Sequence, residues 1–230
     1  MPITIGIYDF FSYTVPGLIY LLVVYAGLNL VRPISVEFGK FSDATIWGSL
    51  ILLVFFSFLV GHIFDSISHR VWYRVFYRGG SQERAYNQFT KIVGVRASFN
   101  PHQWSVLLAA IRHNNAQLAD AIDRNKATSV MLRNISFALF LLGLVFAVQT
   151  FISLGSWYVF APLSIVVFIG SGISLRRSDH FNMAFYHMIY IQALMYGDSM
   201  EKVIEANRDI NRNTSVKKTV AQKRSGKSRK

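Results

Sequence analysis

Ionisable side chains are concentrated between residues 61 and 78, where the sequence reads GHIFDSISHRVWYRVFYR. His62, Asp65 and His69 recur at i, i+3 and i+7, so a helix places them on one face. Two imidazoles and a carboxylate on one face can bind zinc or another divalent ion if further ligands join them. The same groups can instead form a structural polar cluster or contact a proton or ligand, and the sequence leaves these alternatives open.

Further metal ligands would have to come from other segments. Asp9, Asp179 and His180 are expected at the same boundary of the membrane as this cluster. A divalent metal is therefore possible, although nothing in the sequence requires a cofactor.

A second set of side chains follows directly on the same helix. Arg70, Arg74 and Arg78 recur every four residues, and the aromatic residues Trp72 and Tyr73 stand between them. The planar arginine fork suits phosphates, which favours a lipid headgroup, a nucleotide or nucleic acid as the ligand. Arginines that reach from a membrane span toward the headgroups would give the same pattern without binding a specific ligand.

The element that positions both sets is the end of a membrane span. The chain has 230 residues, of which 52% are hydrophobic. Apolar runs long enough to cross a hydrocarbon core of about 30 Å lie at about residues 11–31, 45–64, 135–154 and 157–175. These runs predict an all-α integral membrane protein whose four spans form two hairpins, within residues 1–66 and 131–176.

The distribution of charge predicts the orientation. Residues 66–130 hold nine basic and three acidic residues, and residues 176–230 hold twelve basic ones, whereas the short connections at 32–44 and 155–156 have no basic excess. Cytoplasmic loops of membrane proteins collect Lys and Arg. We therefore expect both termini in the cytoplasm, with a small helical domain formed by residues 67–130 and a helical extension at 177–212.

Within that domain the sequence predicts particular helices. Leu107, Ile111, Leu118 and Ile122 fall on one stripe, so residues 101–124 are expected to form one amphipathic helix. Residues 181–196 are rich in aromatic residues and methionines and are expected to continue the fourth span.

Residues 213–230 form a basic tail that we expect to be disordered. Lipid attraction of about 1 kcal/mol per basic residue near an anionic surface favours membrane contact, and a tail that only keeps the protein soluble is equally compatible with the sequence. Nucleic acid is a weaker alternative, because the tail has no aromatic residue on which bases could stack. Its basic residues are Lys217, Lys218, Lys223, Arg224, Lys227, Arg229 and Lys230.

Other features narrow the class of function. The chain has no cysteine, which excludes disulfides and thiolate chemistry. The spans have no ionisable residue at their centres, which disfavours a proton-coupled pump. Small residues in the spans suit close helix packing and favour a homo-oligomer; they are Gly48, Gly143, Gly170, Gly172 and Ser174.

The segments YDFFSYTVPGLIYLL and LVGHIFDSISHR carry a resemblance to a known group. They resemble small bacterial inner-membrane proteins with four predicted spans, a Tyr-Asp-Phe-Phe start leading to Pro-Gly, and Gly-His at the end of the second span. The resemblance covers about residues 8–75. It implies a bacterial inner membrane, and similar architectures occur as membrane subunits or effectors of anti-phage systems. It implies no catalytic residue.

These observations favour a non-enzymatic, oligomeric membrane anchor or effector. Its basic cytosolic domain would bind a soluble partner protein or an anionic ligand, and its action could include perturbing the membrane in a defence or stress response. One alternative is a metal-dependent enzyme that acts on a lipid or phosphate ester at the membrane boundary. The other is a channel for a small solute, because hydroxyls and carbonyls can also line pores.

Overall fold

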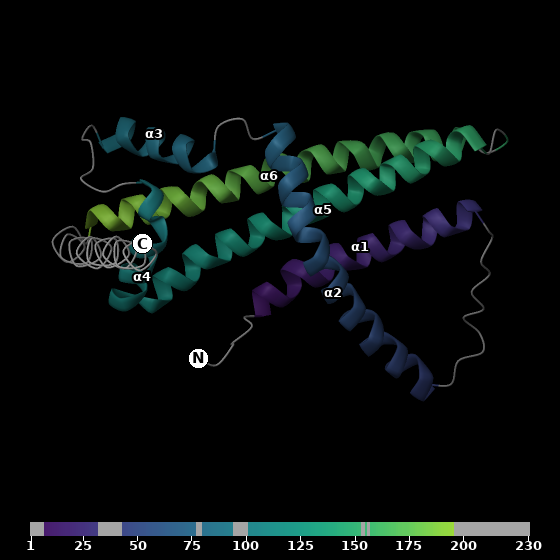
Figure 1. Cartoon of the computed structure of the whole chain (residues 1–230), viewed down its shortest axis with the longest axis horizontal. Helices are drawn as coiled ribbons and strands as arrows, with labels where there is room; N and C mark the ends of the chain where they lie inside the picture. The colour runs from purple at the N-terminus through teal and green to yellow at the C-terminus, as the bar shows by residue number, and fades with distance from the viewer. Residues whose placement is uncertain are drawn as a thin grey trace, which may run out of the picture. The chain divides into compact units, whose positions relative to one another are not determined.

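A computed structural model describes residues 7–31, 43–76, 80–93, 101–152, 155 and 157–195. Every secondary-structure element in these ranges is a helix (Figure 1). The long helices are α1 (Ile7–Val31), α2 (Asp43–Phe76), α5 (Ala116–Ile152) and α6 (Trp157–Met195). The shorter elements are α3 (Ser81–Val93), the 3-10 turn η2 (Pro101–Gln103) and α4 (Trp104–Asn114).

The four long helices are the ones that match the apolar runs of the sequence. Each is long and apolar enough to cross a membrane, within Phe10–Leu30, Trp47–Trp72, Ala116–Ile152 and Trp157–Met195. The prediction of an all-helical chain with four such segments is therefore confirmed for the described residues. α2 and α6 extend well past the predicted span ends, and α6 includes residues 181–195 in one unbroken helix, as the sequence predicted.

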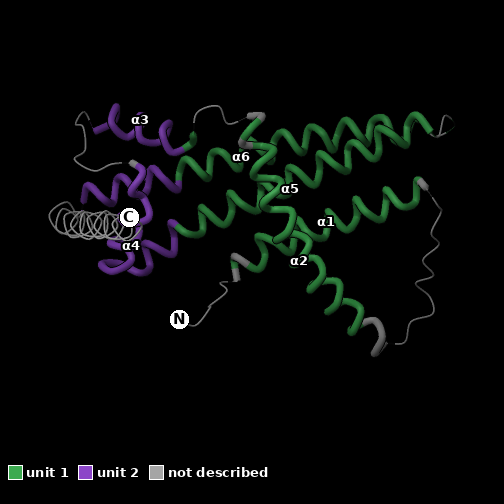
Figure 2. The backbone as a smooth tube through the Cα atoms, viewed as in Figure 1, with its two compact units in different colours: residues 1–81, 123–184 green, residues 82–122, 185–230 purple. Residues whose placement is uncertain are grey.

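The described residues fall into two compact units, coloured separately in Figure 2. Unit 1 holds the described residues within 1–81 and 123–184, and unit 2 holds those within 82–122 and 185–230. Helices α5 and α6 contribute residues to both units.

In unit 1, α1 and α2 cross (Figure 1), and a glycine of each helix lies at the crossing. A Cβ on Gly17 of α1 would overlap the carbonyl group of Ser57, and a Cβ on Gly61 of α2 would overlap that of Tyr13. Only glycine lets the two backbones come this close. The crossing therefore fixes α2 against α1 directly before the ionisable cluster, which begins at His62.

Helices α5 and α6 pack in unit 1 through small residues spaced by seven. Ser129 faces Ser178 and Ser136 faces Ser171, and in both pairs each hydroxyl donates to the carbonyl of the partner at 2.8–2.9 Å. One heptad further on, the Ser164 hydroxyl donates to the Gly143 carbonyl at 2.9 Å. Small residues every seven positions keep one seam between two antiparallel helices, so these three layers set the register of α5 against α6.

Other glycines singled out by the sequence behave differently. Gly143 lies against the Phe168 ring, and the nearest side chain to Gly170 is that of Leu139. Gly48 and Gly172 have no heavy atom near the position of a Cβ, so neither packs closely against another described helix.

Unit 2 has its own hydrophobic core, built from α3, α4, the start of α5 and the end of α6. Fully buried members include Phe89, Leu107, Ile111, Ile122 and Tyr190. The apolar stripe predicted from the sequence thus lies in this core.

The prediction of a single helix over residues 101–124 is wrong, because the helix is interrupted at Asn115. Its backbone is extended, with φ −150° and ψ 96°, and its side-chain Oδ1 accepts a hydrogen bond from the Leu118 amide at 3.0 Å. Asparagine favours helix N-termini for this reason. The residue therefore ends α4 and caps α5.

Candidate anion-binding site

An ion pair joins α2 and α5 at the ionisable cluster. Arg133 Nη2 donates to Asp65 Oδ1 at 2.7 Å, and the two side chains are only 14% and 24% exposed. A pair sheltered in this way is screened less by salt than a surface pair. The carboxylate that the sequence assigned to a metal site is therefore bound by a cation from another helix.

Asn134 holds this carboxylate from a fully buried position. Its Nδ2 donates to Asp65 Oδ1 at 2.9 Å, and its Oδ1 is hydrogen-bonded by the Ser68 hydroxyl. Its backbone carbonyl accepts a hydrogen bond from the Tyr20 hydroxyl at 3.1 Å. The network therefore connects α1, α2 and α5 and fixes the direction of the Asp65 side chain.

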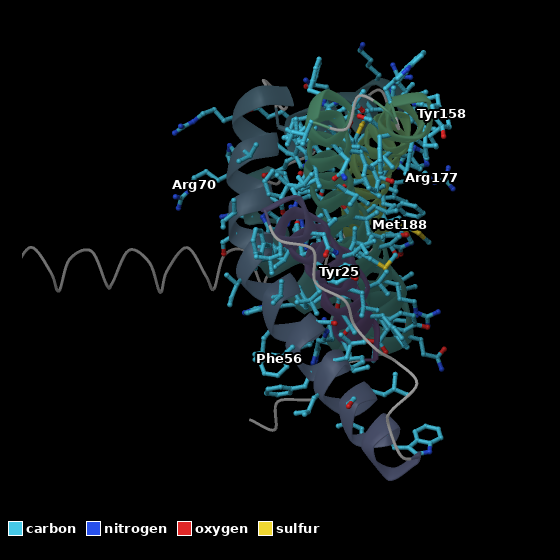
Figure 3. All side chains as sticks on the ribbon, turned by 90° about the vertical axis from the view of Figure 1, so that its right-hand side faces the viewer. Tyr25, Phe56, Arg70, Tyr158, Arg177 and Met188 are labelled. Atoms are coloured by element: carbon cyan, nitrogen blue, oxygen red, sulfur yellow. The ribbon has the colours of Figure 1, made fainter. Side chains whose placement is uncertain are left out.

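An open cavity of about 480 Å³ lies beside this network. Three arginines and one aspartate line it, and the carboxylate of that aspartate is already hydrogen-bonded to Arg133 and Asn134. Arg70 and Arg74 are exposed, and neither forms an ion pair with a carboxylate among the described residues. Figure 3 shows Arg70 projecting outward from α2. The lining residues are Asp65, Ser66, His69, Arg70, Arg74 and Arg133.

This arrangement favours an anion with several oxygen atoms. Guanidinium groups present planar pairs of donors that match phosphate and carboxylate oxygens. Residues from two helices contribute to the cavity, so a bound anion would contact both α2 and α5. The cavity is therefore a candidate binding site for an anion.

The three proposed metal ligands lie in different surroundings. The His62 ring lies edge-on to Tyr13 at 5.0 Å between centroids and parallel to Phe58 at 6.3 Å. Asp65 is bonded to Arg133, and His69 lines the arginine cavity. Among the described residues no three His, Asp or Glu side chains come together as a metal site, so the divalent-metal hypothesis has no support in this part of the chain.

Two of the three other ionisable residues expected at this boundary are described by the structure. Asp179 accepts a hydrogen bond from the Ser81 hydroxyl at 2.9 Å, and the His180 ring lies 6.1 Å from that of Phe181. The side chain of Asp9 lies outside the described residues.

Trp72 does not face the cavity. Its side chain is 5% exposed and packs edge-on against Phe137 and Phe140, with centroids 6.0 and 5.6 Å apart. It therefore anchors the end of α2 to α5 and leaves ligand contact to the arginines. The side chain of Tyr73 and all of Arg78 lie outside the described residues, as does the basic tail with Lys217, Lys218, Lys223, Arg224, Lys227, Arg229 and Lys230.

A smaller cavity of about 330 Å³ lies between α1 and α5. Ser12, Tyr13, Asp123 and Lys126 line it, so one acidic and one basic residue balance there. It has no excess of positive charge and makes a weaker candidate for an anion.

The residues that sequence reasoning missed are Arg133 and Asn134. They directly precede the third apolar run, whereas Asp65 directly follows the second. Two segments that meet the membrane at the same boundary bring such residues to one level, so a charged pair at matching span ends was the available signal.

The fold and the cavity together define a class. The chain is all-helical in its described part, has four helices suited to span a membrane, and has an arginine-lined cavity at one end of the second. The chain matches no protein-family model, and neither curated proteins nor solved structures show a significant match to it. The likeness of its first 75 residues to small bacterial membrane proteins therefore stays a prediction.

Proposed function

We propose that this chain is a non-enzymatic, multi-pass membrane anchor or effector that binds a phosphate-bearing anion in the arginine cavity. The observation that carries the proposal is the convergence of Arg70, Arg74 and Arg133 on one open cavity whose single carboxylate is already bonded. Three arginines and one carboxylate, that of Asp65, give the cavity a net positive charge. A phosphate with two or more oxygen atoms complements this charge and the geometry of the guanidinium groups.

The proposal places the cavity on the cytoplasmic side of a bacterial inner membrane. The basic excess of residues 66–130 and 176–230 supports this side, because cytoplasmic segments collect Lys and Arg. The N-terminal resemblance supports the bacterial setting and suggests a defence or stress response as the context.

Unit 2 is the part of the chain that we assign to a soluble partner protein. Its separate core, with Leu107, Ile111 and Tyr190 buried, supports a domain that keeps its shape outside the bilayer. Its helices α5 and α6 also continue into unit 1, so an anion bound between α2 and α5 would contact a helix shared with the partner-binding part. This continuity is the proposed route by which ligand and partner influence each other.

Titration of the detergent-solubilised protein with pyrophosphate at constant ionic strength tests the proposal. We expect saturable binding by the wild type and at least about a tenfold loss, or 1.4 kcal/mol, in Arg70→Gln/Arg74→Gln. Arg176→Gln/Arg177→Gln removes the same charge from two exposed arginines of α6 outside the cavity and is the matched control. Equal weakening in both variants, or no saturable binding of any phosphate-bearing anion by the wild type, would reject the cavity as an anion site.

A further inference from the structure

Helix α2 carries an exposed apolar series that leads into the arginine cavity. Phe56, Leu59, Ile63 and Ile67 are 53%, 38%, 63% and 44% exposed, and their spacing of three or four residues keeps them on one helix face. Arg70 and Arg74 continue the same spacing. One face of α2 thus changes along its axis from apolar to cationic, and Figure 3 shows Phe56 and Arg70 projecting from the same side of the helix.

The length of this face matches the dimensions of a bilayer. With about 1.5 Å per helical residue, the distance from Trp47 to Ile67 is about 30 Å, the thickness of a hydrocarbon core. Trp47 is 68% exposed, as suits a tryptophan at a membrane interface. The part from Phe56 to Ile67 covers about 16 Å, close to one leaflet. Arg70 and Arg74 therefore lie at the level of the lipid headgroups of that leaflet.

We infer that the arginine cavity binds the phosphate of an anionic phospholipid, with an acyl chain lying along the face from Phe56 to Ile67. The inference rests on the proposed function and names the class of its ligand. Phosphodiester oxygens match the guanidinium donors of Arg70, Arg74 and Arg133. The apolar face, in direct continuation, matches a chain of the length of one leaflet. A soluble phosphate complements the cavity equally well and has no part that would use the apolar face.

The cavity also distinguishes this site from ordinary lipid contact. Arginines that only reach the interface need no second helix, whereas here Arg133 of α5 faces the same cavity as two arginines of α2. Lipids that merely surround a span are attracted by charge alone and do not depend on particular apolar residues. A bound lipid in the cavity is therefore expected to be selected by its charge and to depend on residues of the apolar face.

Native mass spectrometry of protein taken from mixed phosphatidylcholine and phosphatidylglycerol vesicles tests this inference. We expect the wild type to retain phosphatidylglycerol over phosphatidylcholine. Ile63→Ala/Ile67→Ala should lose this retention by about tenfold while it binds pyrophosphate like the wild type. Ile165→Ala/Ile169→Ala, which truncates two isoleucines of α6 that are 60% and 57% exposed at the same spacing, should retain the lipid unchanged.

The outcomes separate the lipid inference from the proposed function. Unchanged lipid retention in Ile63→Ala/Ile67→Ala, or no preference of the wild type for phosphatidylglycerol, overturns the lipid inference when pyrophosphate still binds. Complete displacement of phosphatidylglycerol by an equal concentration of pyrophosphate also overturns it, and assigns the cavity to a soluble anion. If the wild type binds neither pyrophosphate nor phosphatidylglycerol, both the inference and the proposed function fall.

Discussion

At the scale of single residues, Asn134 and Asp65 decide how the cavity is built. Asn134 is fully buried, and its amide bonds both the Asp65 carboxylate and the Ser68 hydroxyl. Asp65 in turn faces Arg133 across the helix interface. A buried polar group that loses its partner keeps the cost of its desolvation. Removing any one of these side chains is therefore expected to lower the stability of the fold, because it leaves a partner without one of its hydrogen bonds.

Replacement of Asn134 by leucine is expected to destabilise unit 1. Leucine has a similar size but removes the bonds to Asp65 and Ser68, and unpaired buried polar groups cost about 1–3 kcal/mol. Thermal unfolding in detergent measures the change. Asn87→Leu, at an exposed position of α3, is the control and should unfold like the wild type. An equal shift in both variants would show that the amide of Asn134 has no special role.

Replacement of Asp65 by asparagine is expected to strengthen anion binding. The substitution removes the negative charge that bonds Arg133 and leaves an oxygen able to accept from Asn134 Nδ2. The cavity then has three cations and no anion, and we expect about tenfold tighter binding of pyrophosphate, or 1.4 kcal/mol. Asp179→Asn removes one carboxylate of α6 that does not line the cavity, and should leave the affinity for pyrophosphate unchanged. Weaker binding by Asp65→Asn would mean that the carboxylate positions the arginines rather than competing for them.

At the scale of elements, small residues set the geometry of both helix pairs. Gly17 and Gly61 let α1 and α2 cross in direct backbone contact, and serine layers hold α5 to α6. Lipid tails are as apolar as leucine, so close packing and hydrogen bonds have to drive association within a membrane. The position of the cavity between α2 and α5 depends on these contacts.

Alanine at the crossing glycines is expected to disrupt the α1–α2 pair. A Cβ at Gly17 or Gly61 meets a backbone carbonyl, which cannot move aside as a side chain would. We expect Gly17→Ala and Gly61→Ala to lose about 1–3 kcal/mol of stability, the usual cost of overpacking. Gly27→Ala and Gly48→Ala have open space at the same helices and should be neutral or slightly more stable, since alanine favours helix by about 0.5–1 kcal/mol. Melting temperatures of the four purified variants measure the difference, and equal temperatures would contradict the crossing.

Introduced cysteines test the register of α5 against α6. The hydroxyl oxygens of Ser136 and Ser171 are 3.3 Å apart, so Ser136→Cys/Ser171→Cys should form a disulfide within one chain on mild oxidation. Ser129→Cys/Ser171→Cys is offset by seven residues, or about 10.5 Å along the helix, and should stay reduced. Because the chain has no native cysteine, no other thiol competes. The readout is the mobility of the oxidised protein in non-reducing gels, and crosslinking of the offset pair would mean a different register.

The sequence predicted the helices better than the contacts between them. Long apolar runs identify four helices because their length and hydropathy are local properties. The break at Asn115 was missed, although the Asn-Asn pair within 101–124 is a capping signal that competed with a continuous apolar stripe. The role of Gly17 could not be predicted locally, because it depends on a carbonyl of Ser57, forty residues away.

The candidate site was predicted in part for the same reason. The helix period places Arg70 and Arg74 near each other, and both line the cavity. The metal hypothesis treated Asp65 as available, but its partner Arg133 lies 68 residues further along the chain. Trp72 has the pattern of an interface residue, and only the rings of Phe137 and Phe140 show that it is buried. Long-range pairing cannot be read from spacing on one helix.

At the scale of the whole molecule, orientation decides which compartment the arginine cavity faces. The connection between α5 and α6 has no basic residue, whereas the segments around α3 and after α6 are basic. The positive-inside rule therefore predicts the α5–α6 connection outside and α3 in the cytoplasm. The cavity at the end of α2 would then meet cytoplasmic ligands and the lipids of the inner leaflet.

Single cysteines report this orientation directly, since the chain has no native thiol. Gly155 is exposed with no heavy atom near its Cβ position, and Asn87 is exposed on α3. In cells with an opened outer membrane, a membrane-impermeant maleimide should label Gly155→Cys at once and Asn87→Cys only after the inner membrane is opened. The reverse pattern would place the arginine cavity on the outer side, and labelling of both sites in intact cells would contradict a membrane barrier between them. The reverse pattern would also place the basic segments on the outer side, and the charge argument for a cytoplasmic anion would then fail.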